Sequence, residues 1–258
     1  MRQVDRRIYL IEKLMEGQPR YEGVLVSSNI KEQERQLRAL MNTRYPGPVP
    51  EEVLKVQDEY LQQRNAEAGI VTVEDMEEYL SDIYLWKGDI TRLKVGAIVN
   101  AANSGMTGCY FPCHGCIDNC IHTFAGMQLR NYCNEIMEKQ GHEEPVGQAK
   151  ITPGFNLPCE NIIHTVGPRV IGPLTDAYKD QLRACYISCL KLADENALES
   201  IAFCCISTGE FMFPYKKAAE IAVETVKKYK AETGSPIKVI FNVFKQEDWV
   251  EYKKLLTQ

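Results

Sequence analysis

Six cysteines and histidines fall within fourteen consecutive positions: Cys109, Cys113, His114, Cys116, Cys120 and His122. Thiolate and imidazole are the ligands that zinc prefers in proteins. The segment also contains glycines and has little apolar periodicity, so metal binding is a better interpretation than unligated core thiols. Spacing alone leaves the ligand set open. Cys113, Cys116 and Cys120 would also suit an iron–sulfur site, and the first two a redox pair.

Two kinds of zinc site are compatible with this loop. Four protein ligands would close the site and make it structural, whereas three would leave a position for water or substrate. Asp118 lies where the following helix is expected to begin. Its carboxylate could cap that helix or orient a water beside the metal. Asn103 and Asp89 likewise suit either a turn or a ligand hydrogen bond.

The loop is placed by the elements around it, which alternate from about residue 81. Short β-rich runs are predicted as strands at 83–86, 97–100, 149–152, 161–166, 200–207 and 237–244. Helices are predicted at 118–139, 175–196, 214–233 and 247–256. Fully apolar strands separated by helices predict an α/β sandwich with largely parallel pairing. Ligands in such sheets bind at the carboxyl ends of strands.

A second loop, STGEFMFP at 207–214, directly follows the apolar run IAFCCI and precedes a predicted helix. Its small residues and Gly209 would let backbone N–H groups turn toward a phosphate. Many strand-to-helix turns use the same residues for geometry alone. The chain has neither the Walker A pattern nor the G-x-G-x-x-G dinucleotide pattern.

Residues 1–80 are predicted as a polar helical extension without a catalytic constellation. Apolar residues keep helical spacing in three segments, and PGPVP at 46–50 breaks the pattern. Thr72 is expected to cap a further short helix that ends near Leu80. The extension is interpreted as a helical cap or a partner-binding appendage.

The composition is that of an ordinary globular protein, with 45% hydrophobic and 25% charged residues. A net charge of −5 argues against a broad nucleic-acid-binding face. No apolar run approaches the roughly 18 residues of a membrane helix. The first residues mix apolar and charged side chains, unlike a secretory signal. We therefore expect a cytoplasmic protein with mostly reduced thiols and with neither nucleic-acid nor membrane partners.

Five segments together resemble the macrodomain family of ADP-ribose-binding modules. They are WKGDIT at 86–91, AIVNAAN at 97–103, CIDNCIHTFAG at 116–126, IIHTVGP at 162–168 and CCISTGEFMFP at 204–214. The resemblance implies a three-layer α/β/α macrodomain over residues 81–258, with a mixed sheet of about six strands, after an N-terminal helical extension over 1–80. De-ADP-ribosylating macrodomains usually carry a glycine run before V-D-x-x-I-H, but FPCHGC replaces that run here.

This departure resembles the microbial zinc-containing macrodomains, whose ligands follow C-x4-H-x-C. That pattern selects Cys109, His114 and Cys116 for one zinc ion per chain and leaves Cys113 and Cys120 as bystanders. Such proteins also carry an N-terminal helical extension. They are often paired with a sirtuin-type transferase that modifies a lipoyl carrier protein. The resemblance thus suggests a lipoyl carrier protein as one substrate.

The resemblance also implies roles for the remaining motif residues. Asp89 would bind the adenine amino group beside the backbone of Ile90, and Phe244 would stack on the adenine. Asn103 and Asp118 would face the distal ribose. The diphosphate would be held by Ser207, Thr208, Gly209, Glu210 and Phe211 together with the helix start at Ile117, Asp118 and Asn119.

The leading hypothesis is a zinc-dependent hydrolase that removes mono-ADP-ribose from modified protein side chains. In it, Asp118 positions or deprotonates the attacking water and Asn103 fixes the ribose. A second hypothesis is an ADP-ribose-binding reader with a structural zinc, which needs a fourth protein ligand such as Cys113 or Cys120. A third is an iron–sulfur or thiol redox protein.

Overall fold

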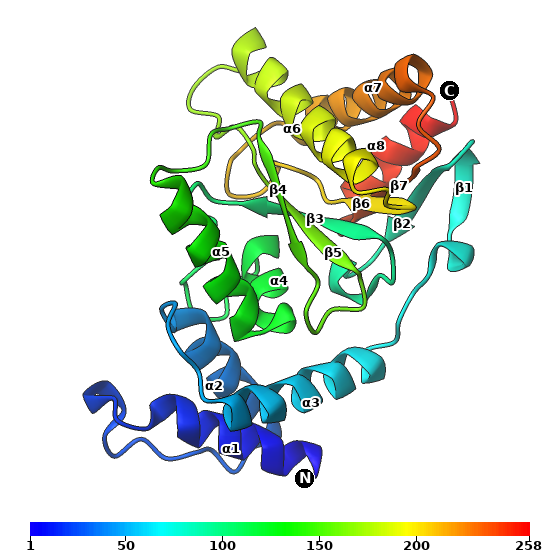
Figure 1. Ribbon diagram of the computed structural model, residues 1–258. Helices are drawn as coiled ribbons and strands as arrows, with labels where there is room; N and C mark the ends of the chain where they lie inside the picture. The colour runs from blue at the N-terminus through cyan, green and yellow to red at the C-terminus, as the bar shows by residue number, and fades with distance from the viewer.

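A computed structural model describes residues 1–258. Its centre is a seven-stranded sheet with the strand order β1-β2-β7-β6-β3-β5-β4 (Figure 1). The strands are β1 Glu77–Leu80, β2 Ile83–Lys87, β3 Ala97–Ala102, β4 Ala149–Pro153, β5 Asn161–Val166, β6 Ser200–Phe203 and β7 Lys238–Val243. The five central strands are parallel, and the edge strands β1 and β4 are antiparallel to their neighbours. The predicted α/β class with a largely parallel, mixed sheet is confirmed.

Helices cover both faces of the sheet. Helices α6, α7 and α8 lie on one face, and α4 and α5 lie on the other (Figure 1). The α-helices are α1 Gln3–Met15, α2 Ile30–Thr43, α3 Glu51–Glu67, α4 Ile117–Ala125, α5 Met127–Gln140, α6 Asp176–Glu195, α7 Tyr215–Thr233 and α8 Gln246–Leu256. Three short 3₁₀ helices are η1 Pro19–Tyr21, η2 Val73–Asp75 and η3 Ile90–Arg92. None of the helices has the length and apolar character needed to cross a membrane.

The chain between α3 and β2 differs from its prediction. The helix expected from Thr72 to about Leu80 is only the single turn η2, in which Thr72 and Asp75 form a capping box. Glu77–Leu80 is instead β1, a seventh strand that the sequence pattern missed. This edge strand is largely exposed and therefore lacks the apolar alternation of a buried strand. Pairing with β2, not its own composition, makes it a strand.

One predicted helix and one predicted strand also have other boundaries in the structure. The helix predicted over 118–139 is two helices, because Gly126 adopts φ +101° between α4 and α5. This φ is one that residues with a side chain rarely adopt, and a Cβ at Gly126 would also lie 2.8 Å from the amide ends of Gln57 and Gln128, so the position favours glycine. The strand predicted over 200–207 ends at Phe203, and the chain then turns toward Ser207, whose φ is +65°.

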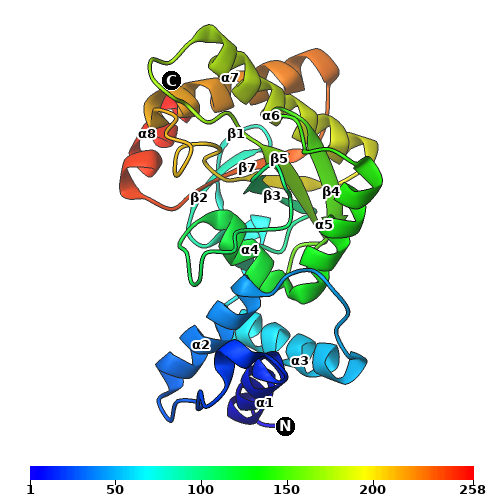
Figure 2. The same ribbon diagram turned by 90° about the vertical axis from the view of Figure 1, so that its left-hand side faces the viewer.

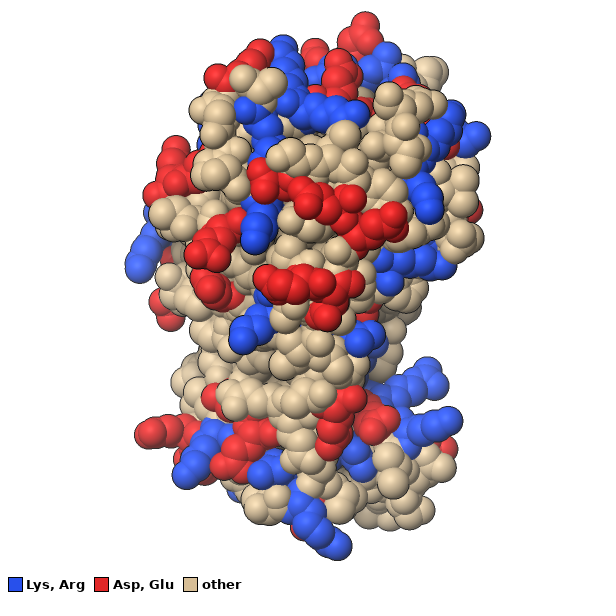
Figure 3. Space-filling view, turned by 90° about the vertical axis from the view of Figure 1, so that its right-hand side faces the viewer, with Lys and Arg blue, Asp and Glu red and all other residues tan.

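Helices α1–α3 form a further layer below α4 (Figures 1 and 2). Seen in space-filling form, the molecule narrows where this layer meets the larger body (Figure 3). The layer has its own apolar cluster of ten buried residues, to which α5 contributes Met127. Buried polar contacts join the two bodies: Asn42 Nδ2 donates to Thr123 Oγ1 at 2.8 Å, and Asn65 Nδ2 donates to the Asn156 carbonyl at 2.6 Å. Such paired contacts fix the layer in one orientation.

Gln57 gives a test of this junction. Its fully buried side chain accepts a hydrogen bond from the Met127 backbone N–H at 2.9 Å. Gln57→Ala leaves that N–H, at the start of α5, buried without a partner, so we expect the free energy of unfolding to fall by about 1–3 kcal/mol. Chemical denaturation measures the change. Lys55→Ala, at an exposed position of the same helix, should change it by less than about 0.5 kcal/mol. Equal effects of both substitutions would contradict this account of the junction.

Candidate active site

The predicted ligand-binding residues follow four neighbouring parallel strands. Asp89 and Ile90 follow β2, Phe244 follows β7, Ser207 to Phe211 follow β6, and Asn103 follows β3. In the sheet these strands stand in the order β2, β7, β6, β3. Strands lie about 4.8 Å apart, so the four strand ends span roughly 14 Å. Across the carboxyl ends of these strands, the residues predicted to bind adenine come first, those predicted to bind the diphosphate come next, and the residue predicted to bind the ribose comes last.

Among these four strand ends, those of β2 and β7 lie beside a solvent-exposed aromatic side chain. Phe244 is 75% exposed immediately after β7. The Gly88 N–H donates to the Val243 carbonyl at 3.0 Å, which holds the turn containing Asp89 beside Phe244. Asp89 caps η3 by accepting from the Thr91 N–H at 3.0 Å through Oδ1. Its Oδ2 accepts no hydrogen bond from the protein, so the capping role leaves one oxygen available.

The loop after β6 offers backbone donors. The N–H groups of Gly209, Glu210 and Phe211 donate to no protein acceptor. At the start of α4, the N–H groups of Ile117 and Asp118 are also free, as is usual for the first turn of a helix. Free N–H groups in a loop and at a helix N-terminus are suited to binding an anion.

Asp118 is the buried carboxylate of the site. It lies in the first turn of α4, and it is only 5% exposed. Asn100 Nδ2 donates to its Oδ1 at 2.8 Å, and Asn103 Nδ2 donates to its Oδ2 at 3.1 Å. Burial raises the pKa of Asp118 to about 6, although both amide hydrogen bonds oppose this rise. A carboxylate with a pKa near neutrality can exchange a proton under physiological conditions.

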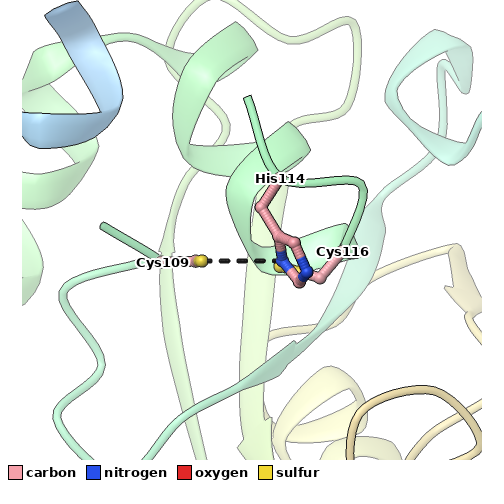
Figure 4. A group of neighbouring side chains, drawn as sticks. All are labelled: Cys109, His114 and Cys116. Carbon is pink, nitrogen blue, oxygen red and sulfur yellow. Dashed lines mark hydrogen bonds between the residues drawn. The ribbon is translucent and has the colours of Figure 1, made fainter. Parts of the chain in front are cut away.

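The three residues selected by the C-x4-H-x-C pattern come together. The ligand atoms of Cys109, His114 and Cys116 all lie within 4.8 Å of one another, and their side chains point toward each other (Figure 4). His114 Nδ1 lies 3.7 Å from Cys109 Sγ. Tetrahedral zinc with its usual bond lengths holds a sulfur and a nitrogen about 3.6 Å apart, so this donor set fits zinc. Cys116 Sγ also accepts from the Asn119 N–H at 3.4 Å, capping α4 two residues before Asp118.

The other two cysteines of the loop are engaged elsewhere. Cys113 Sγ points to the Arg35 carbonyl at 3.3 Å, and Cys120 Sγ accepts from Arg38 Nη2 at 3.4 Å. Neither belongs to the group of ligand atoms that contains His114. The protein therefore brings three ligands together at this point.

Two charged side chains hold His114 in place. Glu210 Oε1 lies 3.5 Å from His114 Nε2, the ring nitrogen other than the one that lies near Cys109 Sγ. Arg38 Nη2, from α2, donates to the His114 carbonyl at 2.7 Å and to Asn119 Oδ1 at 2.8 Å. A carboxylate behind a histidine ligand is a common arrangement in metal sites, because it orients the ring.

Several residues that shape the site had been missed from the sequence. Asn100 is fully buried in β3, and its position in an otherwise apolar strand was a usable signal. Arg38 and Asn42 of α2 contact the loop over residues 109–116, which carries the three candidate ligands and is named the metal loop. Asn42 Oδ1 accepts from the Cys113 N–H at 2.9 Å. Nothing in the helical pattern of α2 distinguished these two side chains from solvent-facing ones.

A second group of histidine and cysteine side chains, His122, Cys133 and His164, lies fully buried near Asp118. Both ring nitrogens of His164 are already used, with Asn100 Nδ2 at 3.1 Å and Thr152 Oγ1 at 3.0 Å. Burial lowers the pKa of His164 to about 3, so its ring is neutral. This group therefore supports the strand and helix behind Asp118.

Comparisons with known proteins agree on one family. A profile described as "Macro domain" matches residues 99–222. The chain is 55% identical over 261 aligned residues to a protein of Treponema medium named protein-ADP-ribose hydrolase, and the alignment covers 100% of both chains. It is 48% identical to a protein of the same name from Staphylococcus aureus, covering 95% of this chain and 93% of the other. The Trypanosoma brucei macrodomain, solved in complex with ADP, has a TM-score of 0.66 at 29% identity, covering 84% of this chain and 95% of that one.

Substitution of the cysteines tests the metal centre. We expect wild-type protein to retain about one zinc ion per chain, and Cys109→Ala to lose most of it, because two ligands hold zinc more weakly than three. Burial raises the pKa of the Cys116 thiol to about 12, so binding must release its proton and zinc affinity should fall as the pH is lowered. Elemental analysis after dialysis gives the zinc content. Cys113→Ala is the matched control and should keep its zinc; loss from both variants alike would contradict the assigned ligand set.

Proposed function

Because this chain belongs to the macrodomain family, we propose that it is a cytoplasmic, zinc-dependent hydrolase that removes mono-ADP-ribose from modified protein side chains. Relatives at 55% and 48% identity, aligned over nearly their whole length, are named protein-ADP-ribose hydrolases. The order of the predicted ligand residues along the sheet supports the same ligand, since an extended nucleotide can lie across the four strand ends.

The observation that carries this proposal is the position of Asp118. Its buried carboxylate stands two residues after Cys116, so the candidate base and the metal ligands share the N-terminus of α4. Cleavage of the bond between the distal ribose and the side chain develops oxocarbenium-like charge and needs an attacking water. Asp118 accepts a proton from that water as the water oxygen bonds to the anomeric carbon, and it returns the proton to the side-chain atom that leaves with the electron pair of the broken bond. Asn103 keeps the carboxylate aimed while fixing the ribose.

Residues far from the reacting carbon supply binding energy. The free N–H groups of 209–211 and of the first turn of α4 hold the diphosphate. Phe244 stacks on the adenine, and Asp89 accepts from its amino group through the oxygen that the protein leaves free. Binding at these remote points positions the ribose next to Asp118, which lowers the entropy cost of the reaction.

Cys109, His114 and Cys116 would hold the zinc ion, which supplies Lewis-acid polarisation and lowers the pKa of a bound water or hydroxyl. Three protein ligands favour a site open to substrate over the closed site of a pure reader, because Cys113 and Cys120 are bonded elsewhere. Glu210 and Arg38 keep the His114 side chain and backbone in place for this purpose.

The activity is tested directly on proteins that carry Ser-, Asp/Glu- or Arg-linked ADP-ribose, with an ADP-ribosylated lipoyl carrier protein as a further substrate. We expect release of ADP-ribose from at least one of these substrates, its loss on chelation and its return with zinc. His114→Ala should reduce turnover by a far larger factor than it weakens ADP-ribose binding, and Cys113→Ala should do neither. ADP-ribose binding without hydrolysis of any of the substrates would favour the reader hypothesis.

The pH profile tests Asp118. Below its pKa of about 6 the carboxyl group is protonated and cannot accept a proton, so kcat/KM should fall about tenfold per pH unit. A bound metal cation lowers this pKa, which places the acidic limb at or below pH 6. Asp118→Ala should lower kcat and lose the limb. Zinc content measured at each pH separates this effect from metal loss, and a wild-type rate in Asp118→Ala would remove Asp118 from the mechanism.

A further inference from the structure

A half-open hollow of about 360 Å³ lies where α2 and α3 face α4. Three arginines line it, Arg35 and Arg38 from α2 and Arg64 from α3, and we name it the arginine hollow after them. Figures 1 and 2 show these helices stacked below α4, so the hollow belongs to the junction between the N-terminal layer and the macrodomain. None of the residues assigned to the ADP-ribose site lines it.

None of the three arginines of the hollow forms an ion pair within the protein. No carboxylate oxygen lies within 4.0 Å of the guanidinium nitrogens of Arg35, Arg38 or Arg64. The one acidic residue of the lining, Glu34, forms its ion pair with Arg7 at 3.3 Å. Asp89 offsets the charge of Arg64 only from a longer range. Positive charge in a concave, partly desolvated surface attracts an anionic group.

The three arginines differ in how many of their N–H donors are already used within the protein. Arg38 is committed to the His114 carbonyl and Asn119, and Arg35 is exposed. The Arg64 guanidinium stacks over the Phe124 ring, 3.4 Å from its centroid, and burial lowers the pKa of Arg64. Arg35 and Arg64 therefore have donor groups left for a ligand, and Arg38 contributes its charge.

Most of the other lining residues are apolar: Met41 and Leu61 are buried beneath the surface of the hollow, and Phe124 is half-buried. A small inorganic anion would leave this surface unused, whereas a peptide segment with an acidic and an apolar side chain would cover both kinds of surface. The hollow also borders the metal loop, since Cys113 lines it and His114 is the next residue. The hollow and the candidate metal site therefore adjoin the same short loop.

We propose that the arginine hollow is a docking site for an acidic segment of the ADP-ribosylated protein substrate. The proposal rests on the proposed function and adds a substrate class to it: proteins with glutamate or aspartate and an apolar residue close to the modified side chain. The N-terminal helices then have a task in recognition, since α2 and α3 supply all three arginines. Charge complementarity of this kind chiefly affects the capture of the partner.

Two synthetic peptides test it. Both carry the same ADP-ribosylated residue, one flanked by Glu-Leu-Glu segments and the other by Gln-Leu-Gln segments. We expect the wild-type protein to have a lower KM and a lower Kd for the acidic peptide. Arg35→Glu should raise both constants for this peptide about tenfold, and leave kcat, the Gln peptide and free ADP-ribose unchanged.

Lys191→Glu is the matched control, because it makes the same charge reversal at an exposed position of α6, away from the N-terminal layer. It should alter neither peptide. Equal KM and Kd for the two peptides, or an equal effect of Arg35→Glu and Lys191→Glu, would overturn the docking site and leave the hydrolase intact. If neither peptide is hydrolysed with Ser-, Asp/Glu- or Arg-linked ADP-ribose, the proposed function fails, and the two Kd values still decide the docking site.

Discussion

The site depends on one buried carboxylate and the two amides that hold it. Asp118 is almost removed from solvent, and a carboxylate in that position must be hydrogen-bonded or it will cost several kcal/mol. Asn100 within β3 and Asn103 just after it supply those bonds. The partly positive N-terminus of α4 favours the negative charge further. These hydrogen bonds therefore join β3, the residue after it and α4. They restrict the positions of the candidate metal ligands in the loop between β3 and α4.

The sheet extends this arrangement into a binding surface. The carboxyl ends of its parallel strands lie side by side, and the strand order matches the order in which the predicted residues would contact the chemical groups of ADP-ribose. The loops contribute free backbone N–H groups, which bind phosphate without needing a charged side chain. The contact of Glu210 with His114 links the phosphate loop to the metal loop. A diphosphate bound at residues 207–211 would thus be connected through one side chain to the loop that carries the candidate metal ligands.

The N-terminal helices complete the site from outside the sheet domain. Arg38 and Asn42 lie one helical turn apart on α2 and bind the backbone of the metal loop at His114 and Cys113. A loop rich in glycine and small polar residues has few apolar contacts to hold it, so these hydrogen bonds restrict its conformations. The same helices surround the arginine hollow. The extension therefore contributes to the order of the metal loop and to the surface that a protein substrate would meet.

The sequence by itself determined the fold class and most strands and helices, because these depend on local periodicity. It also located the cluster of cysteines and histidines, but spacing left the ligand set open, and only the resemblance to zinc-containing macrodomains selected Cys109, His114 and Cys116. It missed β1, the break at Gly126 and the buried partner Asn100, and it gave Arg38 and Asn42 no role. Each of these depends on contacts outside the local segment: β1 on pairing with β2, the start of α5 after Gly126 on the Gln57 side chain that accepts from the Met127 N–H, and Arg38 on a loop 76 residues later. Local patterns record which side chains can be buried or can bind a metal. Only the tertiary structure decided which of these side chains contact each other. The free energy of a long-range contact depends on both segments that form it, so the local pattern of either segment does not reveal it.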